Sequence, residues 1–292
     1  MNKRVRDKLR ESLLSLPSVG WLTAFFLVPS LVVFAIAFKP VNPYGGMADG
    51  WTLGTLRSLA NPSYPSIIWR TIWISVATTI LCIFLATPTG YYIARCGPAR
   101  RRLLLLLVIV PFWTSFLIRI FAWKVLLHPE GLVKRALVSV GLVAPDTPLL
   151  YSAGAVLLVM VYTFLPFAIL PIYAAAEKFD FRLTEAARDL GASPLTAFFR
   201  IFLPAIRRGM WTAILVVLIP ALGSYVIPDL IGGPSGEMIG TKIAQRTFVD
   251  RNLPHASALS ALLMLAVLAP LVIVLALQRQ KTRQEPIVEE DA

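Results

Sequence analysis

Long apolar stretches alternate with short charged segments along this chain. A bilayer core about 30 Å thick needs about 20 helical residues to cross it. Six stretches meet this requirement: 18–38, 71–95, 103–127, 152–176, 209–231 and 257–278. The pattern predicts an all-α integral membrane protein with six transmembrane helices over 18–278, a basic segment at 1–17, a loop at 177–208 and a tail at 279–292.

The first apolar stretch follows a basic leader, as the core of a cleavable signal peptide does. Its apolar run is about twice as long as a usual signal core. We therefore expect a retained membrane span.

Composition also favours a membrane protein. Hydrophobic residues make up 57% of the chain, charged residues 15%, and the mean hydropathy is +0.72, whereas a soluble domain has about 25% charged residues. The net charge of +12 does not indicate nucleic-acid binding, because the basic residues flank apolar stretches. Two cysteines, Cys82 and Cys96, offer neither a disulfide framework nor metal-ligand spacing.

Lysine and arginine are distributed unevenly between the two sides of the predicted bundle. Of 28 such residues, 18 fall on the side that holds both termini and 8 on the other, while Arg119 and Lys124 lie within the third span. Cytoplasmic loops carry the excess of positive charge. We therefore expect both termini and the 177–208 loop in the cytoplasm.

Every predicted span contains proline, which removes an intrahelical hydrogen bond. The prolines are Pro29, Pro88, Pro111, Pro166, Pro171, Pro220, Pro228 and Pro270. Proline is common in membrane helices, which accounts for any one of these positions. Its presence in all six spans favours helices that bend around a central pathway, as in a transporter.

The segment between the fourth and fifth spans is polar. Good helix formers at 181–190 precede Gly191, which suits a left-handed C-terminal cap. Ser193 then offers an N-cap hydroxyl, and Pro194 the preset dihedral of a first helical residue. We predict two short helices with a corner at Gly191, the second of which ends before Pro204.

One face of the second short helix is apolar. It carries Leu195, Phe198, Phe199 and Phe202 at helical spacing. A cytoplasmic loop would not normally expose such a face to water. Either another protein covers it, or it packs on the spans of this chain as an interfacial helix; the pattern alone leaves both open.

This loop resembles the EAA loop of permease subunits of binding-protein-dependent ABC importers. The match covers every fixed position of that motif: Glu185, Ala186, Ala187, Gly191, Ile201, Leu203 and Pro204. The resemblance implies the type I ABC importer permease fold, a place in the bacterial inner membrane, and a coupling helix that fits a cleft of an ATPase subunit. It assigns the first four of these residues to the ATPase contact and the last three to seating the second helix.

The resemblance further implies a homologous second permease, an ATPase dimer and an external substrate-binding protein as partners. ATP would be used by the ATPase subunits, because this chain has no phosphate loop; its nearest glycine-rich stretch, 232–242, has the wrong spacing and lies on the predicted outer side. We therefore expect a non-catalytic subunit that holds no cofactor and no metal.

Three further segments, 111–123, 165–180 and 223–233, are similar to the first permease of spermidine/putrescine importers. The similarity extends over most of the chain, from about residue 20 to 280. It implies polyamine uptake by alternating access. Relatives that carry other small organic cations or amino-acid derivatives share parts of these segments, so import of such a compound is the alternative.

A polyamine pathway should offer carboxylates and aromatic faces, which attract organic ammonium groups. The candidates are Asp229, Tyr225, Trp113, Trp123 and Tyr162. A carboxylate at a helix end, and rings in the lipid belt or core, are the alternative interpretations.

Two residues of the third span carry charge of the wrong sign for a polyamine pathway. They are Arg119 and Lys124. Because intramembrane cations are costly and usually paired, we expect Arg119 to pair with a carboxylate or with helix-end carbonyls, and Lys124 to extend outward.

An ion-coupled secondary transporter is the rival from another class. It would need carboxylates or histidines deep in its spans, whereas the two histidines, His128 and His255, lie at or beyond outer span ends. His255 belongs to Leu253-Pro254-His255, where many importer relatives have Trp-Pro followed by glycine. A membrane enzyme is less favoured, because no nucleophilic, paired-carboxylate or metal arrangement gathers at one depth.

Overall fold

The computed structural model describes residues 15–42 and 44–283 of the 292-residue chain, with side chains up to residue 268. Most of the basic segment 1–17, part of the tail 279–292 and the side chain of Pro270 therefore lie outside the described residues. The described part is helical, and its one β feature is an isolated bridge between Val41 and Met47. The described residues form two compact units, one of 65–241 and one that combines those up to 64 with those from 242 onward.

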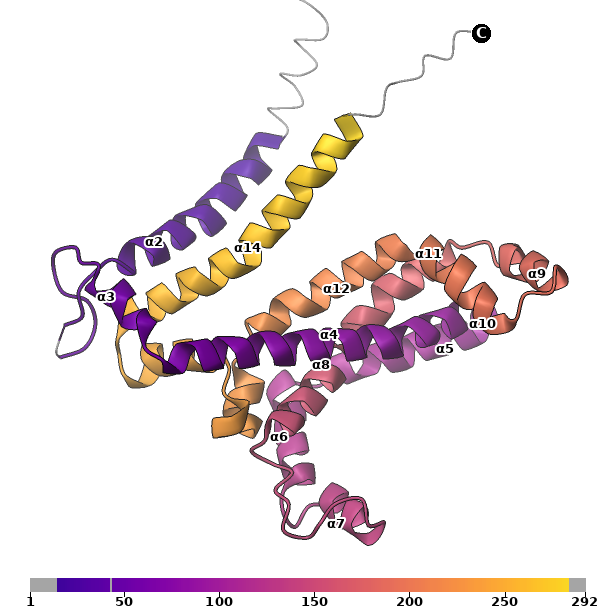
Figure 1. Cartoon of the computed structure of the whole chain (residues 1–292), viewed down its shortest axis with the longest axis horizontal. Coiled ribbons are helices and arrows are strands. Elements are labelled where there is room, and N and C mark those ends of the chain that lie inside the picture. Colours follow the sequence, from indigo (N-terminus) through magenta and orange to yellow (C-terminus); the bar gives the residue numbers. More distant parts are fainter. Residues whose placement is uncertain (1–14, 43, 284–292) are drawn as a thin grey trace, which may run out of the picture. The chain divides into compact units, whose positions relative to one another are not determined.

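The unit 65–241 contains most of the predicted spans (Figure 1). Its α-helices are α4 (Ser63–Arg95), α5 (Pro98–Ile109), α6 (Phe116–Leu127), α7 (Leu132–Ser139), α8 (Ala153–Glu177), α9 (Arg182–Asp189), α10 (Pro194–Ala197), α11 (Leu203–Ala205), α12 (Arg207–Leu222) and α13 (Ile239–Ala244). Shorter 3-10 and π turns are η3 (Val110–Trp113), η4 (Phe198–Phe202), η5 (Pro228–Gly232) and η6 (Pro234–Gly236). α4 begins two residues before this unit, and α13 ends beyond it.

Helix length separates the predicted spans into continuous and broken ones. α4, α8 and the N-terminal helix Ser15–Ile36 are each long and apolar enough to cross a membrane. Two bent pairs of helices, Pro98–Trp113 with Phe116–Ser139 and Pro194–Ala205 with Arg207–Leu222, meet the same criterion only when each pair is taken together. The described residues thus contain three such helices, or five if each bent pair is one span.

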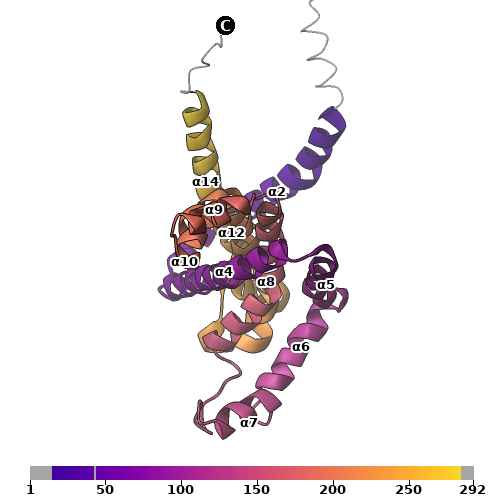
Figure 2. The same cartoon turned by 90° about the vertical axis from the view of Figure 1, so that its right-hand side faces the viewer.

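The third predicted span, 103–127, is not one straight helix. Its two halves meet at 90°, so that α6 and α7 diverge from α5 (Figure 2). Thr114 is extended and Ser115 is non-helical at this break, directly after η3. The fifth predicted span, 209–231, is also interrupted, because α12 ends at Leu222 and helical backbone resumes at Val226, which leads into the π turn at Pro228.

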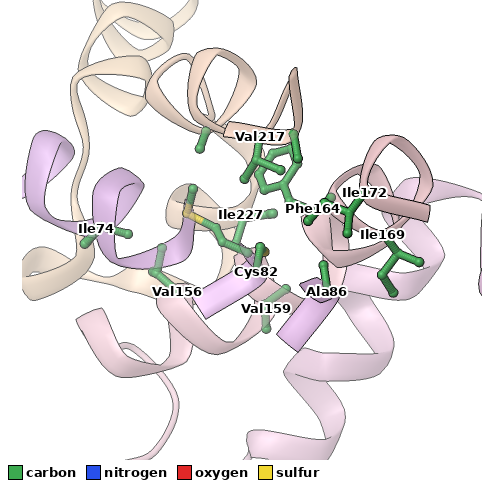
Figure 3. Close-up of a cluster of buried hydrophobic side chains, with 14 of the residues drawn as sticks. Ile74, Cys82, Ala86, Val156, Val159, Phe164, Ile169, Ile172, Val217 and Ile227 are labelled. Atoms are coloured by element: carbon green, nitrogen blue, oxygen red, sulfur yellow. The ribbon is translucent and has the colours of Figure 1, made fainter. Parts of the chain in front are cut away.

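The core of this unit lies between α4, α8, α12 and the turn before η5. Figure 3 shows Cys82 and Ala86 of α4 facing Val159 of α8, with Val217 and Ile227 from the fifth predicted span beside them. All five of these residues are fully buried.

Small residues bring these helices close together. A Cβ at Gly90 would lie 2.9 Å from Cγ2 of Ile172, and one at Gly209 would collide with Cβ of Ala175. Membrane helices associate through such close contacts, because lipid supplies no hydrophobic drive between them.

The other unit contains Ser15–Ile36 with η1 (Thr23–Leu27) and α2 (Val28–Ile36), α3 (Gly54–Arg57), η2 (Ser58–Ala60), η7 (Gln245–Val249) and α14 (Leu253–Arg283). The sixth predicted span, 257–278, falls within α14, which contacts both α2 and α3. The start of α14 is fixed by His255, which is 7% exposed. Its ring nitrogens lie 2.6 Å from the Tyr64 hydroxyl and 3.0 Å from the Ser58 hydroxyl.

Candidate functional site

The corner of the EAA loop is a capped turn between α9 and α10. Gly191 has φ +89°, the left-handed conformation that glycine adopts without strain. Its N–H donates to the Arg188 carbonyl at 2.9 Å, and the Ala192 N–H donates to the Ala187 carbonyl at 2.9 Å, which is a Schellman cap. Ser193 Oγ then accepts from the Thr196 N–H at 3.1 Å as the N-cap of α10. The predicted corner and cap are confirmed.

The second helix of the loop runs further than predicted. Helix continues from Pro194 to Ala205, so the expected end before Pro204 is wrong. The π turn η4 precedes the proline, and the Leu203 N–H bonds to the Phe198 carbonyl five residues back. Proline has no N–H to donate to the α-helical ladder, and the π turn lies just before it.

A cluster of five aromatic rings joins the loop to the end of α4; we call it the aromatic clamp. It consists of Tyr91, Phe179, Phe181, Phe198 and Phe202. Tyr91 lies edge-on to three of the other rings, at centroid distances of 5.7 Å to Phe181, 5.3 Å to Phe198 and 4.7 Å to Phe202. Phe202 is fully buried. The clamp therefore ties both helices of the loop to one transmembrane helix.

Arg95, at the end of α4, extends the clamp toward the EAA residues. Its guanidinium lies 5.5 Å from the Tyr91 ring and 5.7 Å from the Phe181 ring, and it donates to the Tyr91 hydroxyl at 2.9 Å. One carboxylate oxygen of Glu185 lies 3.9 Å from it, with the Glu185 side chain 60% exposed. Glu185 is thus held near α4 and remains accessible from outside.

The other EAA positions divide between exposed and packed. Ala186, Gly191 and Pro204 are exposed, whereas Ala187, Ile201 and Leu203 are partly buried. The apolar face packs on this chain only in part, because Phe198 and Phe202 pack in the clamp while Leu195 and Phe199 remain 71% and 58% exposed. These two exposed residues line an apolar groove of about 970 Å³ with α4 and α12.

The five pathway candidates do not form one site. Trp123 and Tyr162 pack edge to face at 5.4 Å, and the Asp229 N–H bonds to the Tyr225 carbonyl at 2.9 Å. Trp113 is 77% exposed on the surface of this chain. Tyr225 alone among the five lines the cavity described next.

A cavity of about 340 Å³ lies between η3, α6, α8 and the end of α12. Its lining consists of Phe112, Phe116, Arg119, Thr163, Phe164, Phe167, Pro220, Gly223, Ser224, Tyr225 and Val226. The four phenylalanines were not predicted as pathway residues. Phe112 and Phe116 lie on opposite sides of the break at 114–115, whereas Phe164 and Phe167 both belong to α8. The proline content of a span signals a bend without showing which rings lie beside it.

Arg119 does not pair as expected. None of the described residues places a carboxylate within ion-pair distance of it, and its Nε is buried without a hydrogen-bond partner. Its guanidinium lies 5.4 Å from the Phe112 ring and 5.9 Å from the Phe116 ring. Lys124 points elsewhere, with its ammonium 5.9 Å from the Tyr151 ring. Ring faces thus take the place of the anticipated anion, because none of the described acidic residues lines this cavity.

A helical chain with membrane-spanning lengths of apolar helix, a capped EAA corner and an aromatic-lined cavity belongs to the class of transporter membrane subunits. Residues 86–284 match the model of the family described as binding-protein-dependent transport system inner membrane component. The chain belongs to this family and is an integral inner-membrane permease subunit, which is non-catalytic. Among the described residues, no group of histidine, cysteine, aspartate or glutamate could hold a metal ion.

Curated relatives cover most of the chain. The spermidine/putrescine transport system permease protein PotB of Haemophilus influenzae is 38% identical over 241 residues, which are 82% of this chain and 84% of the relative. PotB of Escherichia coli is 34% identical over 242 residues, 83% of this chain and 88% of the relative. The inner membrane ABC transporter permease protein YdcU of Escherichia coli is 31% identical over 280 residues, with coverage of 84% of this chain and 89% of the relative.

Solved structures confirm the importer permease fold. A chain of a bacterial alginate ABC transporter in complex with its pentasaccharide-bound periplasmic protein superposes with a TM-score of 0.70 at 20% identity, covering 95% of this chain and 96% of that one. A second alginate importer structure gives a TM-score of 0.65 at 21% identity, with coverage of 97% of this chain and 100% of that one. At this identity the likeness concerns the fold alone.

Proposed function

We propose that this chain forms half of the translocation pathway of an ATP-driven importer for spermidine and putrescine. The observation that carries the proposal is the complete EAA loop with its capped corner at Gly191, set on a chain 34% to 38% identical to permeases named for these polyamines. A homologous second permease supplies the other half of the pathway. The alternative substrate is another small organic cation or an amino-acid derivative.

In this proposal the partner proteins bind on opposite sides of the membrane. An ATPase dimer binds the loop in the cytoplasm, where Glu185, Ala186, Ala187 and Gly191 form the contact while Ile201, Leu203 and Pro204 seat the second helix. A periplasmic or extracellular binding protein delivers substrate to the outer loops 40–70 and 232–256. ATP is bound and hydrolysed by the ATPase subunits, and both termini of this chain are cytoplasmic.

Replacement of Gly191 by aspartate tests the coupling role. No atom lies within 4 Å of a Cβ at this position, so the side chain fits, but it adds negative charge and backbone strain at the corner. We expect the Gly191→Asp subunit to reach the membrane, to lose the co-purifying ATPase and to lose at least about 90% of uptake. Gly97→Asp is the matched control, because Gly97 is also unobstructed and is the N-cap of α5, where aspartate is favoured.

Uptake of radiolabelled putrescine by proteoliposomes that contain the full complex is the measurement. Uptake should require internal ATP and persist when uncouplers collapse ion gradients, which separates this importer from a secondary transporter. Normal uptake by Gly191→Asp would contradict the coupling role. Absence of polyamine uptake by an intact, ATP-hydrolysing wild-type complex would contradict the proposed substrate and leave the coupling role untouched.

A further inference from the structure

The cavity around Arg119 lies where two broken helices meet. One break is at Thr114 and Ser115, between η3 and α6, and the other follows α12 at Gly223 to Tyr225. The third wall is α8, which contributes Thr163, Phe164 and Phe167 near the middle of its 25 residues. Irregular backbone at membrane depth is tolerated where it lines a cavity, and interrupted helices form substrate sites in transporters.

Aromatic rings dominate the wall of this cavity. Phe112 lies edge-on to Phe167 at 5.0 Å, and Phe164 lies 6.3 Å from Phe167; Phe116 and Tyr225 complete the lining rings. We call these five rings the aromatic cage. No carboxylate from the described part of the chain lines the cavity. Such a wall binds an organic cation through ring quadrupoles, weakly enough that the cation can leave again.

The cage already holds a cation from this chain. The Arg119 guanidinium lies within about 6 Å of the Phe112 and Phe116 rings, the range in which cation–π attraction is significant. No described carboxylate neutralises it, and its Nε has no hydrogen-bond partner. The guanidinium therefore interacts with the cage in the way expected of an ammonium group.

We propose that Arg119 is a tethered occupant of a cation site in the translocation pathway, and that the ammonium groups of the substrate displace it from the aromatic cage during transport. This proposal rests on the proposed polyamine substrate. While Arg119 occupies the cage, its fixed charge in a low-dielectric cavity repels small cations, which the membrane potential would otherwise drive inward. A polyamine delivered to the opened pathway brings several ammonium groups and takes over the ring contacts.

Two substitutions test the role of the Arg119 charge and the role of the aromatic cage separately. Arg119→Met keeps a long side chain and removes the charge, so the empty cage should conduct small cations. Phe112→Leu removes a ring that lies against the guanidinium, so the cage should bind substrate less well. Lys124→Met is the matched control, because Lys124 also lies in the third predicted span but faces Tyr151 and does not line the cavity.

The experiment uses the complete complex in proteoliposomes, with size-exclusion profiles to show that each variant assembles. Leak is measured as efflux of radiolabelled methylammonium without ATP, and transport as ATP-driven uptake at limiting putrescine. Arg119→Met should raise the leak about tenfold or more. Phe112→Leu should lower uptake at least about twofold without raising the leak, and Lys124→Met should change neither.

Other outcomes would overturn the proposal. An assembled Arg119→Met complex with no added leak would show that the charge does not guard the pathway. Loss of assembly in Arg119→Met that Arg119→Lys restores would show instead that Arg119 pairs with a carboxylate of the second permease. The methylammonium leak remains informative if the wild type fails to import polyamine, so failure of the proposed function is recognised separately.

Discussion

His255 is held at both ring nitrogens by residues distant in the sequence. The Ser58 hydroxyl donates its one proton to the Thr55 carbonyl at 2.6 Å, so toward His255 it accepts, and Nδ1 carries the ring proton. Nε2 then accepts from the Tyr64 hydroxyl at 2.6 Å. This arrangement fits a neutral imidazole, with Nδ1 as the donor and Nε2 as the acceptor.

The surroundings of this imidazole, taken together, also favour its neutral form. Burial and the nearby positive charge of Arg246 lower the pKa of His255 from its ordinary value, and Asp250 offsets this only in part. The folded protein therefore takes up the proton less readily than the unfolded chain. The stabilising contribution of His255 is present above about pH 6.5 and is lost as the pH falls below it.

We predict that the wild-type complex loses thermal stability between about pH 7.5 and pH 5.5 more steeply than His255→Gln. At the upper pH the variant should be less stable by about 1–3 kcal/mol, because a buried hydrogen bond is lost. Thermal unfolding of the purified complex at several pH values is the measurement. His128→Gln, at an exposed histidine, should keep the wild-type slope; equal slopes for wild type and His255→Gln would contradict the prediction.

Single residues could be assigned from sequence where the chemistry is local. Gly191 and Ser193 form their cap within a few neighbouring residues, and their type and spacing therefore sufficed. The environment of Arg119 depends on Phe112 across a helix break, and that of His255 on Tyr64, 191 positions away. Partners of this kind are fixed by tertiary packing, which one sequence does not show.

At the scale of elements, the aromatic clamp determines whether the EAA loop moves with α4. Phe202 is its central ring, fully buried and within 6.2 Å of Tyr91, Phe179, Phe181 and Phe198. A force applied at α9 reaches α4 through these contacts. We therefore expect the transmembrane helix and the loop to move together.

Phe202→Ala should loosen this element. Removing a fully buried ring leaves a cavity, and we expect a loss of about 3–5 kcal/mol in unfolding free energy. Cleavage by trypsin at the exposed Arg182 and Arg188 should become faster, and ATP-driven uptake should fall while the subunit stays in the membrane. Phe199→Ala is the control, because Phe199 is 58% exposed and should cost less than about 1 kcal/mol. Unchanged proteolysis in Phe202→Ala would show that the clamp does not hold the loop.

The length of the apolar stretches predicted where the helices lie better than it predicted which of them are broken. The continuous helices α4 and α8 contain Pro88, Pro166 and Pro171 and still run unbroken. The third predicted span breaks at Thr114, three residues after Pro111. Proline therefore does not by itself identify a broken span, and the 90° bend that shapes the cavity required the structure.

At the scale of the whole molecule, the uneven distribution of lysine and arginine predicts one orientation in the membrane, with the EAA loop in the cytoplasm. The chain carries its own probes of this prediction, because Cys82 and Cys96 are free thiols. Cys82 is fully buried within α4, whereas Cys96 is partly exposed immediately after Arg95. Since Arg95 lies beside Glu185, Cys96 reports the side on which the loop lies.

A membrane-impermeant maleimide should label Cys96 in inside-out vesicles and leave it unlabelled in intact spheroplasts. Cys96→Ser should abolish the labelling, since Cys82 is packed against α8, with its Sγ 3.7 Å from the Val161 carbonyl. Cys82→Ser should keep the wild-type pattern, which assigns the signal to one site. Labelling of Cys96 from the periplasmic side would invert the orientation and place the EAA loop where no cytoplasmic ATPase could reach it. Labelling of Cys96 therefore tests both the orientation predicted from the charge distribution and the cytoplasmic position that the coupling role requires.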